Sequence, residues 1–142
     1  MEVMREIRIT DVHDEAAVAE LRDQLVVYNL ESTGYGEYRP LSCFLRSAAR
    51  ELEAGVAGFS LDGYAMIEWL WVAPSLRGAG LGRRLVEAVE AEVRTRGCRV
   101  IRVNTYTFQA PDFYRRLGYE RIGYAEDTPT DHGEIFFAKR LS

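Results

Sequence analysis

The sequence lacks the features of several large protein classes. Only two cysteines occur in 142 residues, and no apolar run approaches the ~20 residues that a membrane-spanning helix needs. A membrane span is therefore not expected, and Cys43 and Cys98 are expected to be buried free thiols rather than a disulfide. The first ten residues carry charge and no apolar signal-peptide segment, so we expect a cytoplasmic protein.

An excess of positive charge is also lacking. The chain has 18 Lys and Arg against 22 Asp and Glu, a formal net charge of -4. This balance argues against general nucleic-acid binding and mildly favours cationic partners, although Arg94, Arg96 and Arg99 form a local basic patch that could offset it. Internal repeats, low-complexity segments and linkers are absent as well, so residues 1–142 are expected to form one domain.

The hydrophobic pattern switches between the periods of strands and helices. A first helix is expected after Asp11 or Asp14 and to about Tyr28, followed by a loop over residues 29–40. Such a mixture, with a hairpin turn at 62–63, suggests a single mixed sheet flanked by helices. The remaining predicted elements are strands at 5–10, 41–47, 53–61, 64–72, 99–106, 119–125 and 134–139, and helices at 81–96 and 111–117.

Three glycines, Gly78, Gly80 and Gly82, stand around the start of the helix predicted at 81–96, in the segment VAPSLRGAGLGRRL. The first N–H groups of a helix have no intrahelical partner, and the helix dipole adds partial positive charge there. Glycines remove the Cβ atoms that would keep a ligand away from this backbone. The segment therefore predicts an anion site, with phosphate as the usual guest.

The spacing of these glycines separates the common phosphate motifs. The dinucleotide pattern G-x-G-x-x-G fails because Arg83 holds its last position, and the P-loop pattern fails because Arg83 and Arg84 replace its Lys-Ser/Thr pair. The pattern R-x-x-G-x-G is met by Arg77, Gly80 and Gly82. A glycine-rich turn that binds nothing remains the alternative.

Two segments together resemble the GCN5-related N-acetyltransferases. LWVAPSLRGAGLG is similar to the acetyl-CoA motif of that family, and FQAPDFYRRLGYE is similar to its second landmark, A-x-x-F-Y-x-x-x-G-Y. The resemblance implies an α/β fold: a mixed, mostly antiparallel sheet of six to seven strands, splayed between strands 4 and 5 and flanked by about four helices. It also implies that acetyl-CoA lies in the splay and that catalysis needs no metal.

The resemblance assigns the cofactor contacts residue by residue. The strand end at Leu70, Trp71 and Val72 would pair with the pantetheine arm. Thr107 stands where the family often has an asparagine that bonds this arm. The loop would offer its amides to the pyrophosphate, with added charge from Arg83, although a solvated helical arginine is an equal alternative. The full expected set is Leu70, Trp71, Val72, Arg77, Gly78, Ala79, Gly80, Leu81, Gly82, Arg83, Thr107, Ala110 and Phe113.

Acetyl transfer to an amine needs a base for the amine, donors for the thioester oxygen and a donor for the leaving thiolate. Tyr114 matches the family's tyrosine and is the candidate acid; the alternative is a core tyrosine beside Phe113. Glu68 lies in an otherwise apolar strand and is the candidate base; the alternative is a solvated carboxylate. The backbone N–H of Val72 is the expected oxyanion donor.

Aromatic residues are expected to form the acceptor pocket, because their faces suit a cationic amine. Tyr28, Tyr35, Trp69 and Tyr106 are the main candidates, and Tyr38, Trp71 and Phe108 are further ones. The loop at 127–134 holds Asp127, Asp131, His132 and Glu134 and could suggest a metal. Ordinary loop acidity is the favoured explanation, and the resemblance implies that no metal is needed.

The sequence therefore predicts an N-acetyltransferase that moves an acetyl group from acetyl-CoA directly to a primary amine in a ternary complex. Two alternatives within the same fold are a non-catalytic CoA-binding module and an enzyme with a protein or tRNA acceptor. A structural protein with an empty turn is a third. A homodimer is left open, with the last strand, EIFFAKRL, as a candidate edge.

Overall fold

The computed structural model describes residues 4–142, which divide into two compact units, one ending at Gly36 and the other covering Glu37–Ser142. The N-terminal unit holds helix α1, Glu15–Thr33. Asp14 begins it as one of the two predicted caps, since its carboxylate accepts a 3.0 Å hydrogen bond from the Ala17 N–H. That both units form one domain remains a prediction.

Two predictions in the N-terminal unit are wrong. The helix continues past Tyr28 to Thr33, because the turn signal of the following segment begins only at Gly34, whose φ of 75° ends the helix. Residues 5–10 form no strand in the structure, although their polar and apolar residues alternate. A strand needs a hydrogen-bonded neighbour, and no strand of the described chain pairs with this segment.

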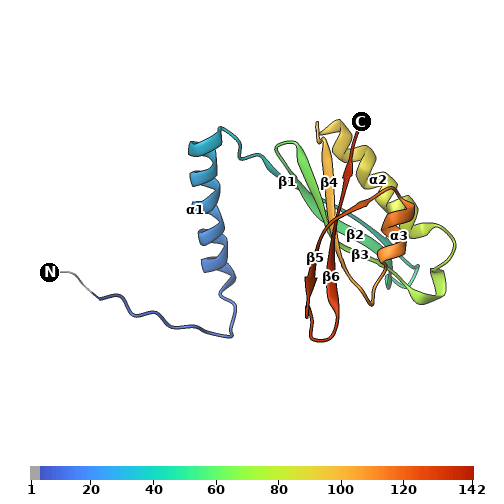
Figure 1. The fold of residues 1–142 in the computed structure, drawn as a ribbon, viewed down its shortest axis with the longest axis horizontal. Helices are drawn as coiled ribbons and strands as arrows, with labels where there is room; N and C mark the ends of the chain where they lie inside the picture. Colours follow the sequence, from blue (N-terminus) through green and yellow to red (C-terminus); the bar gives the residue numbers. More distant parts are fainter. Residues whose placement is uncertain (1–3) are drawn as a thin grey trace. The chain divides into compact units, whose positions relative to one another are not determined.

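The second unit is built on a six-stranded mixed sheet (Figure 1). Only β3 and β4 run parallel, so the sheet is mostly antiparallel, as predicted. The strands are β1 (Tyr38–Arg46), β2 (Leu52–Leu61), β3 (Tyr64–Val72), β4 (Val100–Tyr106), β5 (Glu120–Glu126) and β6 (Gly133–Arg140), in the order β1-β2-β3-β4-β6-β5. Since β6 lies between β4 and β5, the expectation that the last strand forms an edge is wrong.

Short helical elements connect the central strands. A 3-10 turn, Pro74–Leu76, and helix α2, Leu81–Thr95, join β3 to β4. Helix α3, Pro111–Arg116, joins β4 to β5. With α1 these agree roughly with the expected four helices, and the predicted α/β fold class is confirmed.

The core lies between α2 and one face of the sheet. Leu85, Val86, Val89 and Val93 of α2 are buried, and burying such a side chain fully stabilises the fold by ~1.5–3 kcal/mol. They share a cluster with β-strand residues, among them Val56, Ile67, Ile101, Val103 and Phe137. This packing fixes β2 and β3 against α2.

The central strands β3 and β4 separate halfway along their length. Their ladder runs only from Tyr64↔Val100 to Ile67↔Val103. Beyond Ile67, β3 stays paired with β2 as far as Val72, and β4 stays paired with β6 as far as Tyr106. The sheet is therefore splayed between these two strands, which are the fourth and fifth of the sequence-based prediction.

Candidate active site

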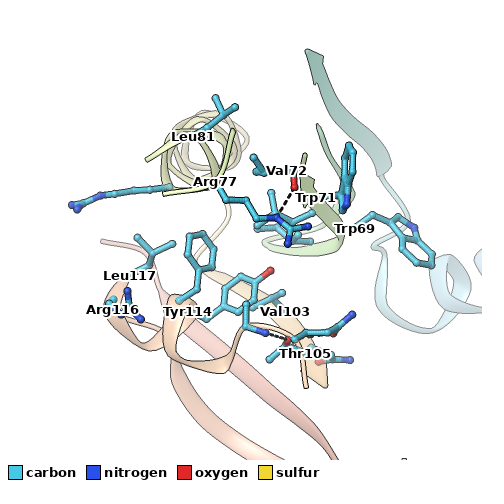
Figure 2. A pocket seen from close by; sticks show the side chains of 18 of the residues that line it. Trp69, Trp71, Val72, Arg77, Leu81, Val103, Thr105, Tyr114, Arg116 and Leu117 are labelled. Carbon is cyan, nitrogen blue, oxygen red and sulfur yellow. Dashed lines mark hydrogen bonds between the residues drawn. The ribbon is translucent and has the colours of Figure 1, made fainter. Parts of the chain in front are cut away.

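A cleft of about 1100 Å³ opens in the splay between β3 and β4 (Figure 2). Its lining comes from the second half of β3, the glycine loop, the first turn of α2, the end of β4 and helix α3. One residue of β6, Glu134, completes it. The segments that carry the two sequence motifs therefore meet in one cavity.

A β-bulge at Glu68 shapes the β3 side of the cleft. Ala57 pairs with Trp69 and Gly58 with Ile67, which leaves Glu68 without a partner on β2. Such an extra residue reverses the alternation of side chains along the strand. Before the bulge Ile67 is buried in the core, and after it Leu70 and Val72 pack against the core instead. Glu68 itself is exposed in the cleft.

Gly58 on β2 makes this bulge sterically feasible. A Cβ atom at Gly58 would overlap the backbone carbonyl oxygen of Met66 on β3. The close approach of the two backbones is what a bulge produces next to its extra residue. The sequence reveals the glycine but not the reason for it.

The glycines of the loop meet two different needs. Gly78 and Gly80 have φ values of 85° and 83°, and a Cβ on either would meet open space. Glycine is required here because the backbone is left-handed, a conformation that other residues rarely adopt. Gly82 has an ordinary φ, but a Cβ there would lie 3.4 Å from Cζ of Phe113. It lets the start of α2 approach α3 closely.

The N-terminus of α2 presents free amides. The first intrahelical bond of α2 runs from the Arg84 N–H to the Gly80 carbonyl at 3.0 Å, so the N–H groups of Leu81, Gly82 and Arg83 precede it. No side chain caps this end, and its first turn holds no acidic residue. The end therefore carries uncompensated partial positive charge and suits an anion.

Two arginines near this end differ in their contacts. Arg77 donates from Nε to the Val72 carbonyl at 2.8 Å and so ties the loop to the end of β3 (Figure 2). Arg83 lines the cleft but forms an exposed pair with Glu87 at 2.8 Å along the helix. Its guanidinium is therefore paired with a surface carboxylate, as expected for a solvated arginine on a helix.

Tyr114 is held by aromatic packing in α3. It is 6% exposed, and its ring contacts Phe113, Tyr119 and Phe137 at centroid distances of 5.0, 5.8 and 6.1 Å. Burial raises the pKa of its phenol to about 12. Figure 2 shows its hydroxyl pointing toward the end of β3, where Val72 and Arg77 lie. The phenol is thus protonated at neutral pH and aimed into the cleft.

The cleft reaches both faces of the sheet. Along β4, Val103 and Thr105 are buried on the face that α2 and α3 cover, whereas Asn104 and Tyr106 alternate to the opposite face. All four residues line the same cleft. This is feasible only because β3 has left β4 at this level, so that one cavity passes through the sheet.

Charge divides the cleft lining into two parts. Its arginines, Arg77, Arg83 and Arg116, come from the loop, α2 and α3. Its carboxylates, Glu68 and Glu134, come from β3 and β6. The helix-side part of the cavity is therefore suited to an anion and the strand part to a cation.

Most residues predicted for the site line this cleft. Tyr38, Ala79 and Thr107 do not. The Thr107 hydroxyl accepts a 3.2 Å hydrogen bond from the Gly133 N–H, and the Thr107 N–H bonds back to the Gly133 carbonyl at 2.8 Å. Tyr28 and Tyr35 belong to the N-terminal unit, so their role stays a prediction. The predicted residues in the lining are Glu68, Trp69, Leu70, Trp71, Val72, Arg77, Gly78, Gly80, Leu81, Gly82, Arg83, Tyr106, Phe108, Ala110, Phe113 and Tyr114.

Sequence reasoning missed five polar residues of the lining. These are Asn104, Thr105, Gln109, Arg116 and Glu134. Gln109 accepts a 2.9 Å hydrogen bond from the Tyr106 N–H and shapes the turn after β4. Side chains alternate along a strand, so the sequence places Asn104 on the same face as the predicted Tyr106 and could have indicated it. Nothing local marks Glu134, because only the pairing of β4 with β6 brings it here.

Residues 16–121 match the family described as acetyltransferase (GNAT) domain. This chain belongs to the GNAT acetyltransferase family. The resemblance inferred from the two motifs is thereby confirmed, and so is the interpretation of the protein as an acetyltransferase enzyme. None of the helices in residues 4–142 of this GNAT acetyltransferase is long and apolar enough to span a membrane.

Individual relatives cover nearly the whole chain. It is 36% identical over 138 residues to the blasticidin-S acetyltransferase of Streptomyces morookaense. The match covers 94% of this chain and 96% of that protein. It is 32% identical over 115 residues to acetyltransferase Atu2258 of Agrobacterium fabrum, covering 81% and 84%. The solved structure of a Bacillus cereus acetyltransferase superposes with a TM-score of 0.78 at 28% identity, over 94% of this chain and 98% of the other.

Proposed function

We propose that this GNAT acetyltransferase transfers an acetyl group from acetyl-CoA to a primary amine, directly and within a ternary complex. The observation that carries the proposal is the cleft through the splayed sheet, which joins an anion site at α2 to a carboxylate-bearing, aromatic part at β3 and β6. A donor and an acceptor of opposite charge fit the two parts at once. Direct transfer then needs no covalent enzyme intermediate.

The donor part fits the anionic and pantetheine portions of acetyl-CoA. The free N–H groups of Leu81, Gly82 and Arg83 suit a pyrophosphate. Beyond Ile67 the edge of β3 that faced β4 is unpaired, so residues 70–72 can pair with the pantetheine arm as with an added strand. Acetyl-CoA, when bound there, supplies the thioester that the amine attacks.

Tyr114 acts mainly as a hydrogen-bond donor to the leaving sulfur. Its pKa of about 12 makes it a weaker acid than a thiol of pKa ~8.5, by a free energy of about 5 kcal/mol. Full proton transfer to the thiolate is therefore uphill. A phenol that stays protonated nevertheless stabilises the developing negative charge, because a hydrogen bond to a charged group is stronger than one between neutral groups.

Glu68 receives the proton of the acceptor amine. An ammonium of pKa ~10 has no free electron pair, so it must lose a proton before it can attack. The bulge places the Glu68 carboxylate in the cleft and leaves it exposed, so that it takes the proton directly or through water and passes it to solvent.

The acceptor is a small cationic amine. The carboxylates at Glu68 and Glu134 and the aromatic rings of Trp69 and Tyr106 in the cleft favour a cation. The relative from Streptomyces morookaense is named for blasticidin S, and its match extends over 94% of this chain. A protein or tRNA acceptor is the second candidate, for which the described cleft offers no additional basic lining beyond its three arginines.

A thiol-release assay with acetyl-CoA tests this function. The panel contains blasticidin S, alkyl amines and diamines, a peptide with a free N-terminus, and tRNA. We expect CoA release with the small cationic amines. Heat of binding for acetyl-CoA without release for any acceptor would instead favour a non-catalytic CoA-binding module.

A further inference from the structure

Asn104 has a buried oxygen that the fold leaves unsatisfied. Its Oδ1 atom is inaccessible to solvent and has no hydrogen-bond partner among residues 4–142. The residue lines the cleft from the face of β4 opposite to the helices. A buried amide oxygen without a partner is costly, so its retention next to a cavity points to a donor supplied by a ligand.

Glu134 lies beside Asn104 on the same face of the sheet. In the β4–β6 ladder Asn104 is opposite Phe136 and Tyr106 is opposite Glu134, so Asn104 and Glu134 are diagonal neighbours. Such neighbours are ~7–8 Å apart, within the span of one ligand group that bonds to both side chains. Glu134 is half-buried, lines the cleft and forms no ion pair within the described chain.

An aromatic wall adjoins this pair of side chains. Tyr106 follows Asn104 on the same face of β4, and its ring stacks on Phe108 with centroids 5.4 Å apart and planes at 10°. Phe108 in turn contacts His132 edge to face at 4.9 Å. Tyr106 and Phe108 both line the cleft. Aromatic faces next to an unpaired carboxylate and an unsatisfied amide oxygen favour a cation rich in N–H donors.

We propose that Asn104 and Glu134 form a subsite for a second cationic group of the acceptor, a guanidinium or an ammonium, separate from the amine that is acetylated. This subsite rests on the proposed function and narrows its substrate class to acceptors with two cationic groups. The second group donates N–H bonds to the Glu134 carboxylate and to Asn104 Oδ1, which a rotation of the Asn104 side chain brings to the surface of the cleft. Glu68 takes the proton of the reacting amine, and Tyr114 bonds to the leaving sulfur. Asn104 and Glu134 thus determine specificity and take no part in the chemical step.

The test compares two amines that differ in the second cation. Agmatine carries a primary amine and a guanidinium, and pentylamine carries the amine alone. For the wild-type enzyme we expect kcat/KM to be at least tenfold higher with agmatine. Glu134→Gln and Asn104→Leu should each raise KM for agmatine about 10- to 100-fold, the range of one charge-assisted hydrogen bond, while KM for pentylamine and both kcat values change less than about twofold.

Glu120→Gln is the matched control, since Glu120 is exposed on β5 and outside the cleft lining. It should leave both amines unaffected. Equal kcat/KM for agmatine and pentylamine, or equal effects of Glu134→Gln on both, overturns the subsite even if the enzyme acetylates amines. If no amine is acetylated, the proposed function fails, and calorimetric titration of each amine into the CoA-saturated protein still decides the subsite: agmatine binding that Glu134→Gln weakens supports it, and binding without preference over pentylamine overturns it.

Discussion

Gly58→Ala tests whether the bulge at Glu68 builds the site. A Cβ at position 58 overlaps the Met66 carbonyl oxygen, so the two backbones must move apart or β3 must lose its extra residue. Losing it reverses the alternation of the strand end and turns Leu70 and Val72 out of the core. Both side chains are half-buried, so exposing them together with the overpacking costs about 2–3 kcal/mol in the free energy of unfolding.

Urea denaturation measures this loss. With a slope of ~2 kcal/mol/M, the midpoint should fall by about 1–1.5 M. Acetyl-CoA affinity should fall as well, because residues 70–72 are displaced. Gly123→Ala is the matched control: Gly123 lies in a strand at an ordinary φ, and a Cβ there meets Phe136 no closer than 3.6 Å. If Gly58→Ala matched this control in both stability and acetyl-CoA binding, the role assigned to the bulge would be wrong.

The remaining predictions concern the titrating and catalytic groups. Tyr114→Phe should lower kcat about 10- to 100-fold with the Kd for acetyl-CoA within about twofold, because it removes one hydrogen bond to developing charge; unchanged turnover in the thiol-release assay refutes the donor role. Glu68→Gln should lower kcat/KM by about 100-fold at pH 7 and progressively less toward the amine pKa of ~10, where the base is not needed, so a pH-independent ratio removes Glu68 from the mechanism. Burial raises the pKa of Tyr114 to about 12 and raises the pKa of Tyr119 too, so the folded state retains protons that the unfolded chain releases above pH ~10. The free energy of unfolding therefore falls as pH rises from ~10, and Tyr114 alone accounts for a loss of about 1.4 kcal/mol at pH 11. Urea unfolding at pH 9 and pH 11 should show this loss, and the loss should be smaller in Tyr114→Phe. Equal losses in the two proteins would contradict the prediction.

Local sequence patterns predicted well the helices and the glycine loop that border the proposed donor part. The start of α2 at Leu81, the left-handed glycines before it and the helix that carries Tyr114 all depend on residues within a few positions of one another. Backbone conformation at such places follows from glycine and proline chemistry, which a single sequence displays. The splay itself was predicted from the similarity of two segments to the motifs of the family, and not from hydrophobic periodicity.

The proposed acceptor part of the cleft depends on contacts between segments far apart in sequence. Glu134 enters the cleft through its pairing with Tyr106, and the bulge at Glu68 requires Gly58 on the neighbouring strand. Likewise Glu90 of α2 is 3% exposed and pairs with Lys139 of β6 at 2.7 Å, 49 positions away. No local pattern specifies which strands are neighbours, so the sequence alone indicates neither these pairings nor the parts that Gly58 and Glu134 play.

The most direct test of the central claim is the initial-velocity pattern of CoA release when acetyl-CoA and a small cationic amine are varied together. Direct transfer in one cleft predicts CoA release in step with acetylated amine, and double-reciprocal lines that intersect. Parallel lines, or CoA release that does not depend on the amine, would contradict a ternary complex in the splay between β3 and β4.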